Sequence, residues 1–200
     1  MTPLPIPRGP GKARIWLTAD EHYFHENIIK YQGRPFANVR EMNEALIDNH
    51  NAVVKEGDFV FHVGDICLGS LFDLVSVLRR LNGTHYLIDG SHDRAMSQYE
   101  REPAADLSGK VVLLPKLVEF KYGGEKITLC HYAMAKWWCS HHGAPHFFGH
   151  SHGHYDPPGR AIDVGVDVQG FAPILIDEAI RKALKKQVIA NHPRDEGDGE

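Results

Sequence analysis

Short apolar runs alternate with amphipathic segments in the first half of the chain, and this alternation limits the folds that the chain can adopt. The runs lie at 15–19, 59–64, 85–89, 111–114, 127–130, 146–149 and 161–166. Each has the length of a strand rather than of a buried helix. Strand–helix alternation favours parallel pairing early in the chain, and the succession of strands in the second half favours an antiparallel return. The sequence therefore predicts two packed sheets with helices outside.

Three helices are indicated by their end residues as well as by their apolar spacing. The first is expected within 37–54, where Asn38 can cap it. The second is expected to begin at Ser70, and the last at Asp177 as its cap. A β-hairpin is predicted around the glycine pair at 123–124.

The 200 residues are 42% hydrophobic and 24% charged, which fits one globular domain with a sizeable core. We assign this domain to 13–190, between an irregular lead-in at 1–12 and a flexible acidic tail at 191–200. The net charge of −4 argues against a surface for bulk nucleic-acid binding. No apolar stretch approaches the ~20 residues of a membrane span, and the start lacks the core of a signal peptide. We therefore expect a cytoplasmic protein without a membrane partner, whose oligomeric state the sequence leaves open.

Histidine is the residue in excess, with 14 copies against three cysteines. The absence of a C-x-x-C pair argues against a cysteine zinc knuckle. Polar motifs follow five of the apolar runs: Asp20-Glu21-His22, Asp65, Gly90-Ser91-His92-Asp93, His131 and His150-Ser151-His152. Ligands of open α/β sheets bind outside the carboxyl ends of the strands. We therefore expect these motifs to meet on one rim.

Such a rim would hold two carboxylates and four imidazoles, which is a set of metal ligands. This mixture suits Mn, Fe, Zn, Co or Ni better than Mg or Ca, which prefer oxygen ligands. One ion needs about four protein ligands, so six candidates fit two ions that share a bridging carboxylate. Residues two apart on an extended chain point to the same side, so the Asp20/His22 pair and the His150/His152 pair can each face one region. Taken singly, each residue has a turn or cap role as its alternative.

The ordered motifs resemble those of the calcineurin-like metallophosphoesterases, which are D-x-H, G-D, G-N-H-D, H and G-H-x-H. The resemblance covers residues 20–152. The flanking segments DEHYFHENIIKYQGRPF and AIDVGVDVQGFAPI are similar to the small single-domain bacterial and phage branch of that family. The resemblance implies an α/β fold, a four-layer α/β/β/α sandwich of two mixed sheets flanked by helices, with a di-metal centre at the strand ends.

The resemblance also implies a role for each motif residue. It assigns one ion to Asp20, His22 and His152 and the other to His131 and His150, with Asp65 as the bridge. His92 would be the proton donor to the leaving oxygen, oriented by Asp93. Ser91 stands where the family has an asparagine that ligates the second ion, so the affinity of that site is in question.

The function expected from these features is di-metal-dependent hydrolysis of phosphate esters, phosphodiesters in particular. Two transition metal ions, Mn²⁺ first among them, would activate a hydroxide, and His92 would act as general acid. His25, Arg34 and Lys136 are expected contacts of a small phosphate ester or diester substrate. The alternatives are a metal-binding or interaction protein in which Ser91 marks decayed catalysis, and a nuclease, which the acidic composition does not favour.

Overall fold

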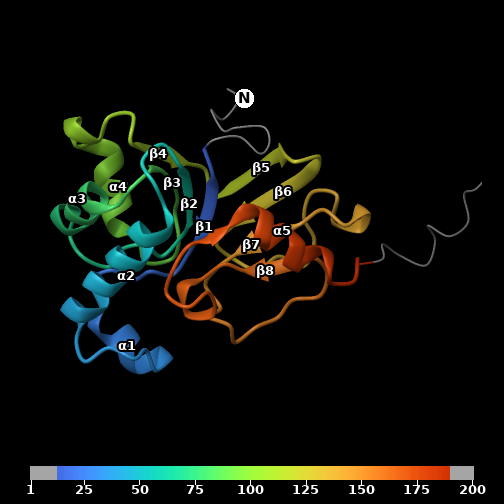
Figure 1. Ribbon diagram of the computed structural model, residues 1–200, viewed down its shortest axis with the longest axis horizontal. Helices are drawn as coiled ribbons and strands as arrows, with labels where there is room; N and C mark the ends of the chain where they lie inside the picture. Colours follow the sequence, from blue (N-terminus) through green and yellow to red (C-terminus); the bar gives the residue numbers. More distant parts are fainter. Residues whose placement is uncertain (1–12, 190–200) are drawn as a thin grey trace, which may run out of the picture.

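The computed structural model of the chain describes residues 13–189 and pairs the apolar runs into two mixed β-sheets flanked by helices (Figure 1). The first sheet has the order β4-β3-β2-β1-β9, with β1 at Ile15–Thr18, β2 at Phe59–Val63, β3 at Thr84–Ile88, β4 at Val111–Leu114 and β9 at Ile174–Leu175. The second has the order β5-β6-β7-β8, with β5 at Leu117–Tyr122, β6 at Glu125–Cys130, β7 at His146–Phe148 and β8 at Ala161–Asp163. The lead-in at 1–12 and the tail at 191–200 lie outside the described residues.

Parallel pairing in the first sheet brings the candidate motifs to one edge. β1 pairs in parallel with β2, β2 with β3, and β3 with β4, whereas β9 joins β1 in the antiparallel sense. The carboxyl ends of β1, β2 and β3 therefore lie at the same edge of the sheet. The segments that leave this edge carry the motifs at 20–22, 65 and 90–93.

The second sheet differs from the antiparallel return expected from the sequence. β5 and β6 form the predicted hairpin, but β6, β7 and β8 pair with one another in parallel. Long connections at 131–145 and 149–160 carry the chain back before each parallel strand, as parallel pairing requires. The predicted strand positions are confirmed, apart from β9, which was not predicted, and the antiparallel direction predicted for this half is wrong for the pairing of β6, β7 and β8.

Five α-helices and three 3₁₀ segments are present in residues 13–189. The α-helices are α1 (Glu26–Gln32), α2 (Val39–Val53), α3 (Leu71–Arg80), α4 (Arg94–Arg101) and α5 (Ile176–Leu184). The 3₁₀ segments are η1 (Ala105–Leu107), η2 (Ser140–His142) and η3 (Val166–Val168).

The helix ends confirm two of the three predicted caps. The Asn38 side chain accepts a hydrogen bond from the backbone N–H of Glu41, and Ser70 forms a capping box with Asp73. Asp177 is not the cap of α5, because β9 runs to Leu175 and the helix begins at the next residue. Helices α1 and α4 were not predicted, since both are short and mostly polar.

Two apolar cores hold these layers together. Between the sheets, the rings of Phe61 and Phe120 stack with centroids 5.5 Å apart, and α5 adds Ile176 and Ala179 to the same cluster. Burial of each such large side chain contributes about 1.5–3 kcal/mol. Helices α2, α3 and α4 lie on the other face of the first sheet (Figure 1) and form the second core with it. This sheet is covered on both faces, which explains its continuous apolar runs.

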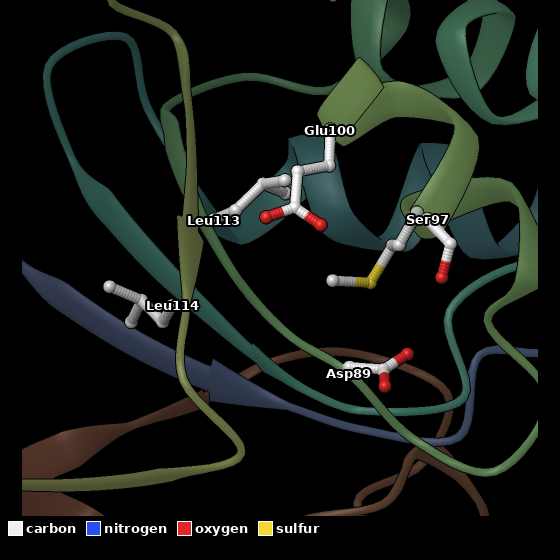
Figure 2. A pocket seen from close by; sticks show the side chains of 6 residues that line it. Asp89, Ser97, Glu100, Leu113 and Leu114 are labelled. Atoms are coloured by element: carbon white, nitrogen blue, oxygen red, sulfur yellow. The ribbon is translucent and has the colours of Figure 1, made fainter. Parts of the chain in front are cut away.

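A small pocket of about 110 Å³ lies between α4 and the ends of β3 and β4 (Figure 2). It is lined by Asp89, Met96, Ser97, Glu100, Leu113 and Leu114. Figure 2 shows Asp89 and Glu100 on opposite sides of it, and Asp89 also pairs with Lys116 at 2.9 Å. The lining contains no imidazole, so this pocket is distinct from the histidine-rich rim at the ends of β1 and β2.

Candidate metal centre

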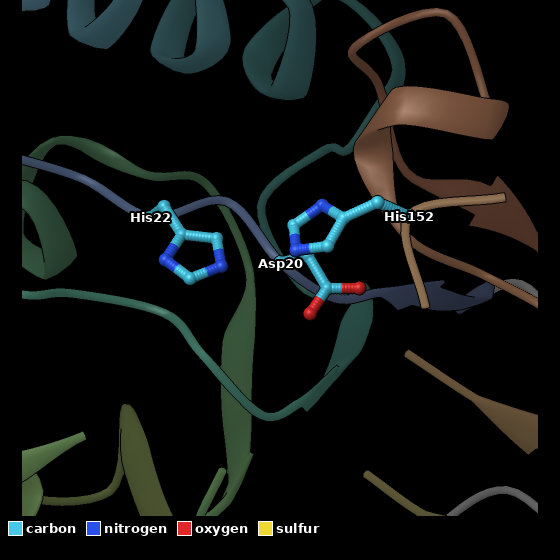
Figure 3. Close-up of side chains that lie close together, drawn as sticks. All are labelled: Asp20, His22 and His152. Carbon is cyan, nitrogen blue, oxygen red and sulfur yellow. The ribbon is translucent and has the colours of Figure 1, made fainter. Parts of the chain in front are cut away.

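The structure brings the six predicted ligands into two adjacent groups. The first group is Asp20, His22 and His152, and the second is Asp65, His131 and His150. Within each group the potential ligand atoms all lie within 4.8 Å of one another. Figure 3 shows the first group, with Asp20 and His22 on the segment after β1 and His152 on the loop after β7. The expected convergence on one rim is confirmed.

The first group is largely buried. Asp20 is 0% and His22 is 2% exposed. Both Asp20 carboxylate oxygens accept from the backbone N–H of His150 at 2.9 Å. Burial raises the pKa of Asp20 to about 7 and lowers the pKa of His22 to about 3. Each shift reflects the cost of holding a charge at a buried position.

The second group is more open to solvent. Asp65 and His131 are buried, whereas His150 is exposed. The Nδ1 of His131 lies 2.9 Å from the Val63 carbonyl oxygen, which only accepts, so Nδ1 carries the proton and Nε2 presents its lone pair. Burial opposes ionisation of Asp65, but its charge interaction with His131 and the hydrogen bond that it accepts from the His92 backbone N–H lower the pKa of Asp65 overall.

The strained backbone of the chain is concentrated at these ligands. Eight non-glycine residues in the described range have positive φ, and five of them are predicted ligands: Asp20 (57°), His22 (53°), Asp65 (55°), His150 (68°) and His152 (47°). Left-handed backbone at bulky residues costs about 1–3 kcal/mol each and persists where the surroundings enforce it. The chain at the two residue pairs is therefore not extended. Asp20 and His22 nevertheless share one group, as predicted, whereas His150 and His152 belong to different groups, so the prediction for that pair is wrong.

Glycines allow close packing around two of the ligands. Gly149 packs against Asp20, and an added Cβ would lie 2.7 Å from the Asp20 carboxylate. At Gly90 an added Cβ would collide with the backbone nitrogen and side chain of Asp65. A larger residue at either position would push a ligand out of its group.

These residues fit divalent transition metal ions. The Nε2 atom of His22 is buried and has no hydrogen-bond partner within residues 13–189, and the nearest Asp65 oxygen is 3.7 Å away. Burial keeps this imidazole neutral, which is the form that binds metals. An unpartnered imidazole nitrogen beside a buried carboxylate offers mixed nitrogen and oxygen donors, which match the ligand preferences of Mn, Fe, Zn, Co or Ni.

The motif after β3 surrounds the carboxylate of Asp65. The Ser91 hydroxyl lies 3.0 and 3.2 Å from the two Asp65 oxygens, and the His92 backbone N–H donates to Asp65 at 2.8 Å. The His92 ring is solvent-exposed and lies 5.6 Å from the His22 ring, centroid to centroid. His92 therefore lies on the solvent side of the ligands.

Asp93 does not have the role that the resemblance implies. Its carboxylate is buried and accepts from the backbone N–H groups of Gly90, Asp65, Ile66 and Cys67, at 2.7–3.2 Å. Burial raises the pKa of Asp93 to about 6 against the opposing effect of these N–H groups. Asp93 thus fixes the loop that carries Asp65, and within residues 13–189 it makes no hydrogen bond to the His92 ring.

The three expected substrate contacts fare differently. His25 joins the site, with its Nδ1 3.3 Å from the Nδ1 of His22 and its ring 6.1 Å from that of His92. Lys136 is exposed and has no ion pair within the described part of the chain. Arg34 does not face a substrate, because its side chain is fully buried and paired with Asp167. The expectation for Arg34 is wrong.

Sequence analysis missed two polar residues behind the ligands. Asp167, in η3, accepts from Nδ1 of His152 at 2.7 Å. Glu21, between the first two ligands, points the other way and pairs with the buried His62 at 2.6 Å. Asp167 lies soon after β8, and the rule that located Asp65 after a strand applies to it also.

The fold and site define a mixed α/β protein with two adjacent histidine–carboxylate groups. The chain is 30% identical to the uncharacterized protein MJ1445 of Methanocaldococcus jannaschii over 191 residues, which cover 88% of this chain and 94% of that protein. The chain belongs to the family of that protein. No family model matches the chain.

A solved structure has a similar fold. The protein of unknown function AQ665 from Aquifex aeolicus superposes with a TM-score of 0.62 at 21% identity, covering 85% of this chain and 99% of that one. This likeness supports the fold alone. Among residues 13–189, no helix combines the length and apolar character needed to cross a membrane.

Proposed function

We propose that the protein is a di-metal-dependent hydrolase of phosphate esters, phosphodiesters in particular, of the calcineurin-like metallophosphoesterase type. The observation that carries this proposal is the pair of adjacent ligand groups with Asp65 between them. The order of the five motifs supports the same type, and the two sheets with their flanking helices are compatible with its four-layer α/β/β/α sandwich.

Asp20, His22 and His152 would hold one ion, and His131 and His150 the other, with Asp65 shared. When bound, two divalent cations supply a lowered pKa for water and neutralise the charge of a phosphate ester. The four imidazoles favour Mn²⁺ over Mg²⁺ for both positions.

The chain's own residues supply the remaining chemistry. His92 would donate the proton that the leaving alkoxide oxygen needs, since its exposed ring lies beside the ligands without being one of them. His25 lies next to both His22 and His92 and would contact the phosphate oxygens. Asp93 would hold the Asp65 loop in place during the reaction.

A second candidate function is metal binding without turnover. Ser91 donates its hydroxyl hydrogen to Asp65 instead of offering the amide oxygen of the family motif, so it withdraws charge from the shared carboxylate. This favours weaker binding of the second ion, and therefore a protein that binds metal to support an interaction rather than to catalyse a reaction. The retained His92 favours the hydrolase, because metal binding alone has no need of a proton donor.

Hydrolysis of bis(p-nitrophenyl) phosphate by metal-free protein supplemented with Mn²⁺ tests the proposal. We expect turnover that depends on added metal and is lost in Asp65→Asn. The matched control is Asp106→Asn, which neutralises an exposed aspartate that pairs with Arg79 on the surface. Binding of two ions without turnover on any mono- or diester would favour the second candidate, and absence of metal binding would reject both.

A further inference from the structure

Arg34 is a buried residue whose guanidinium is completely engaged. Its side chain is 0% exposed. Nε and Nη2 donate to the two oxygens of Asp167, each at 2.8 Å. Nη2 also donates to the Asp20 carbonyl at 2.7 Å, and Nη1 donates to the Glu21 carbonyl at 2.9 Å. Arginine suits this position because its planar fork can bind a carboxylate and two carbonyls at once.

Asp167 connects the Arg34 guanidinium to His152 of the first ligand group. Its Oδ2 accepts from Arg34 and from Nδ1 of His152, the latter at 2.7 Å. A proton held at Nδ1 leaves Nε2 as the only nitrogen that can bind an ion.

Arg34 and Asp167 therefore connect two parts of the chain that carry the same ligand group. One part is the backbone at Asp20 and Glu21, and the other is His152 on the loop after β7. Asp20, His22 and His152 all have left-handed backbone, which needs support from outside the loop. The guanidinium provides that support through its hydrogen bonds to the Asp20 and Glu21 carbonyls and to the Asp167 carboxylate.

The second group has a different kind of support. Nδ1 of His131 is held by the Val63 carbonyl, and His150 is exposed. The backbone N–H of Asp65 donates to the Asp93 carboxylate, and the carboxylate of Asp65 accepts from the backbone N–H of His92. Within the described residues, neither Arg34 nor Asp167 contacts a member of this group.

We infer that Arg34 and Asp167 are positioning residues for the first metal ion alone, setting its affinity through the carbonyl of Asp20 and the tautomer of His152. The inference rests on the proposed function, since it needs the first ligand group to bind a metal. It assigns to Arg34 a role that requires no contact with substrate.

Titration of Mn²⁺ into metal-free protein tests this inference without any substrate. Each of Arg34→Lys and Asp167→Asn is made in two backgrounds. In His150→Ala the second site is disabled, so the titration reports binding of the first ion. In His22→Ala the first site is disabled, so it reports binding of the second ion. Loss of a partner that orients a metal-binding histidine costs about 10–100-fold in affinity. We expect at least about a tenfold loss for the first ion and less than about a twofold change for the second.

The matched control is Arg80→Lys, because Arg80 makes the same two-bonded pair with Glu44 on the exposed surface of α3 and α2. It should leave both affinities unchanged. Nitrogen-15 NMR of His152 gives a readout that general destabilisation would not move: Asp167→Asn should shift the proton from Nδ1 toward a mixture of tautomers. If Arg34→Lys does not fold, Asp167→Asn still tests the inference.

Unchanged affinity for the first ion, or equal losses for both ions, would overturn the inference and leave the proposed function standing. A parent protein that binds no Mn²⁺ would instead overturn the proposed function and the inference with it. The two failures are thus distinguished by the titration of the unmodified chain.

Discussion

His22 Nε2 lies 3.7 Å from Oδ2 of Asp65, although these residues belong to different ligand groups. The same Asp65 oxygen lies 3.3 Å from Nε2 of His131 in its own group. One carboxylate oxygen thus stands between two imidazole nitrogens, and this contact is what turns two separate groups into one candidate centre.

Asp65→Asn should weaken the binding of both ions, and more strongly than the loss of any residue that belongs to one group only. Asparagine keeps the shape of the side chain but removes a negative charge that both cations would share. Metal analysis after gel filtration, compared with His150→Ala and with the surface control Asp106→Asn, measures this. Retention of two ions per chain in Asp65→Asn would show that Asp65 is not shared.

Removal of metal with a chelator should abolish hydrolysis, and Mn²⁺ should restore it at least as well as Mg²⁺. The reason is the four imidazole ligands, which a hard ion binds weakly. Initial rates at equal free metal concentration provide the comparison. Better restoration by Mg²⁺ would contradict the assigned ligand set.

His92→Ala should slow the hydrolysis of diesters with alkyl leaving groups by about 10²–10⁴-fold. Hydrolysis of activated aryl esters should slow much less, because only a poor leaving oxygen needs a proton. Metal content should stay the same, since His92 belongs to neither group. His141→Ala removes an exposed histidine of η2 and serves as the control. Equal losses on both substrate classes would exclude the general acid role.

Ser91→Asn should tighten binding of the second ion. A serine oxygen is about 1.2 Å short of an asparagine carbonyl oxygen, and the Ser91 hydroxyl is engaged with Asp65. Metal–oxygen bonds span only ~2.0–2.2 Å, so this difference decides whether a ligand can reach. Calorimetric titration of both proteins with Mn²⁺ measures the change, and two equally tight sites in each would refute the prediction.

Stability of the metal-free protein should fall as the pH drops from 6.5 toward 4. Burial lowers the pKa of His50 and of His146 to about 4 in the folded state, while the unfolded value is 6.5. Burial lowers the pKa values of His22 and His85 as well, so the unfolded chain binds more protons at four histidines in this window, against the opposite effect of the raised pKa values of two carboxyl groups, Asp20 and Asp93. The free energy of unfolding therefore decreases as the pH falls. Between pH 6.5 and pH 5 each histidine contributes a loss of up to about 2 kcal/mol.

Urea unfolding at several pH values, with chelator present, measures this loss. His146→Gln should reduce the pH dependence, whereas the exposed His141→Gln should leave it unchanged. Identical pH profiles for His146→Gln and the parent chain would contradict a neutral buried His146.

The sequence predicted the strand positions, two helix caps and the meeting of the ligands because these depend on local pattern and on one rule of sheet topology. Asn38 and Ser70 act through bonds three residues away, and the carboxyl ends of parallel strands meet wherever such a sheet forms. Local pattern contains no equivalent signal for Arg34, because its partner Asp167 lies 133 positions away. A buried arginine and an exposed one look the same in sequence.

Two further outcomes depended on three-dimensional surroundings. Asp93 has four backbone N–H groups within reach only after the loops following β2 and β3 are in place. The left-handed backbone of the ligands is enforced by tertiary contacts against local preference, so no propensity indicates it.

The 133-position separation of Arg34 and Asp167 also bears on the order of events in folding. Contacts between distant segments form late, because the intervening chain must first lose its freedom. The first ligand group therefore cannot assemble on a nascent chain until the segment through η3 has been synthesised and docked. Metal capture by this group would be a final step, so a translation product that ends before residue 167 would leave the ribosome with all three ligands of the first group but without the support that Asp167 gives them.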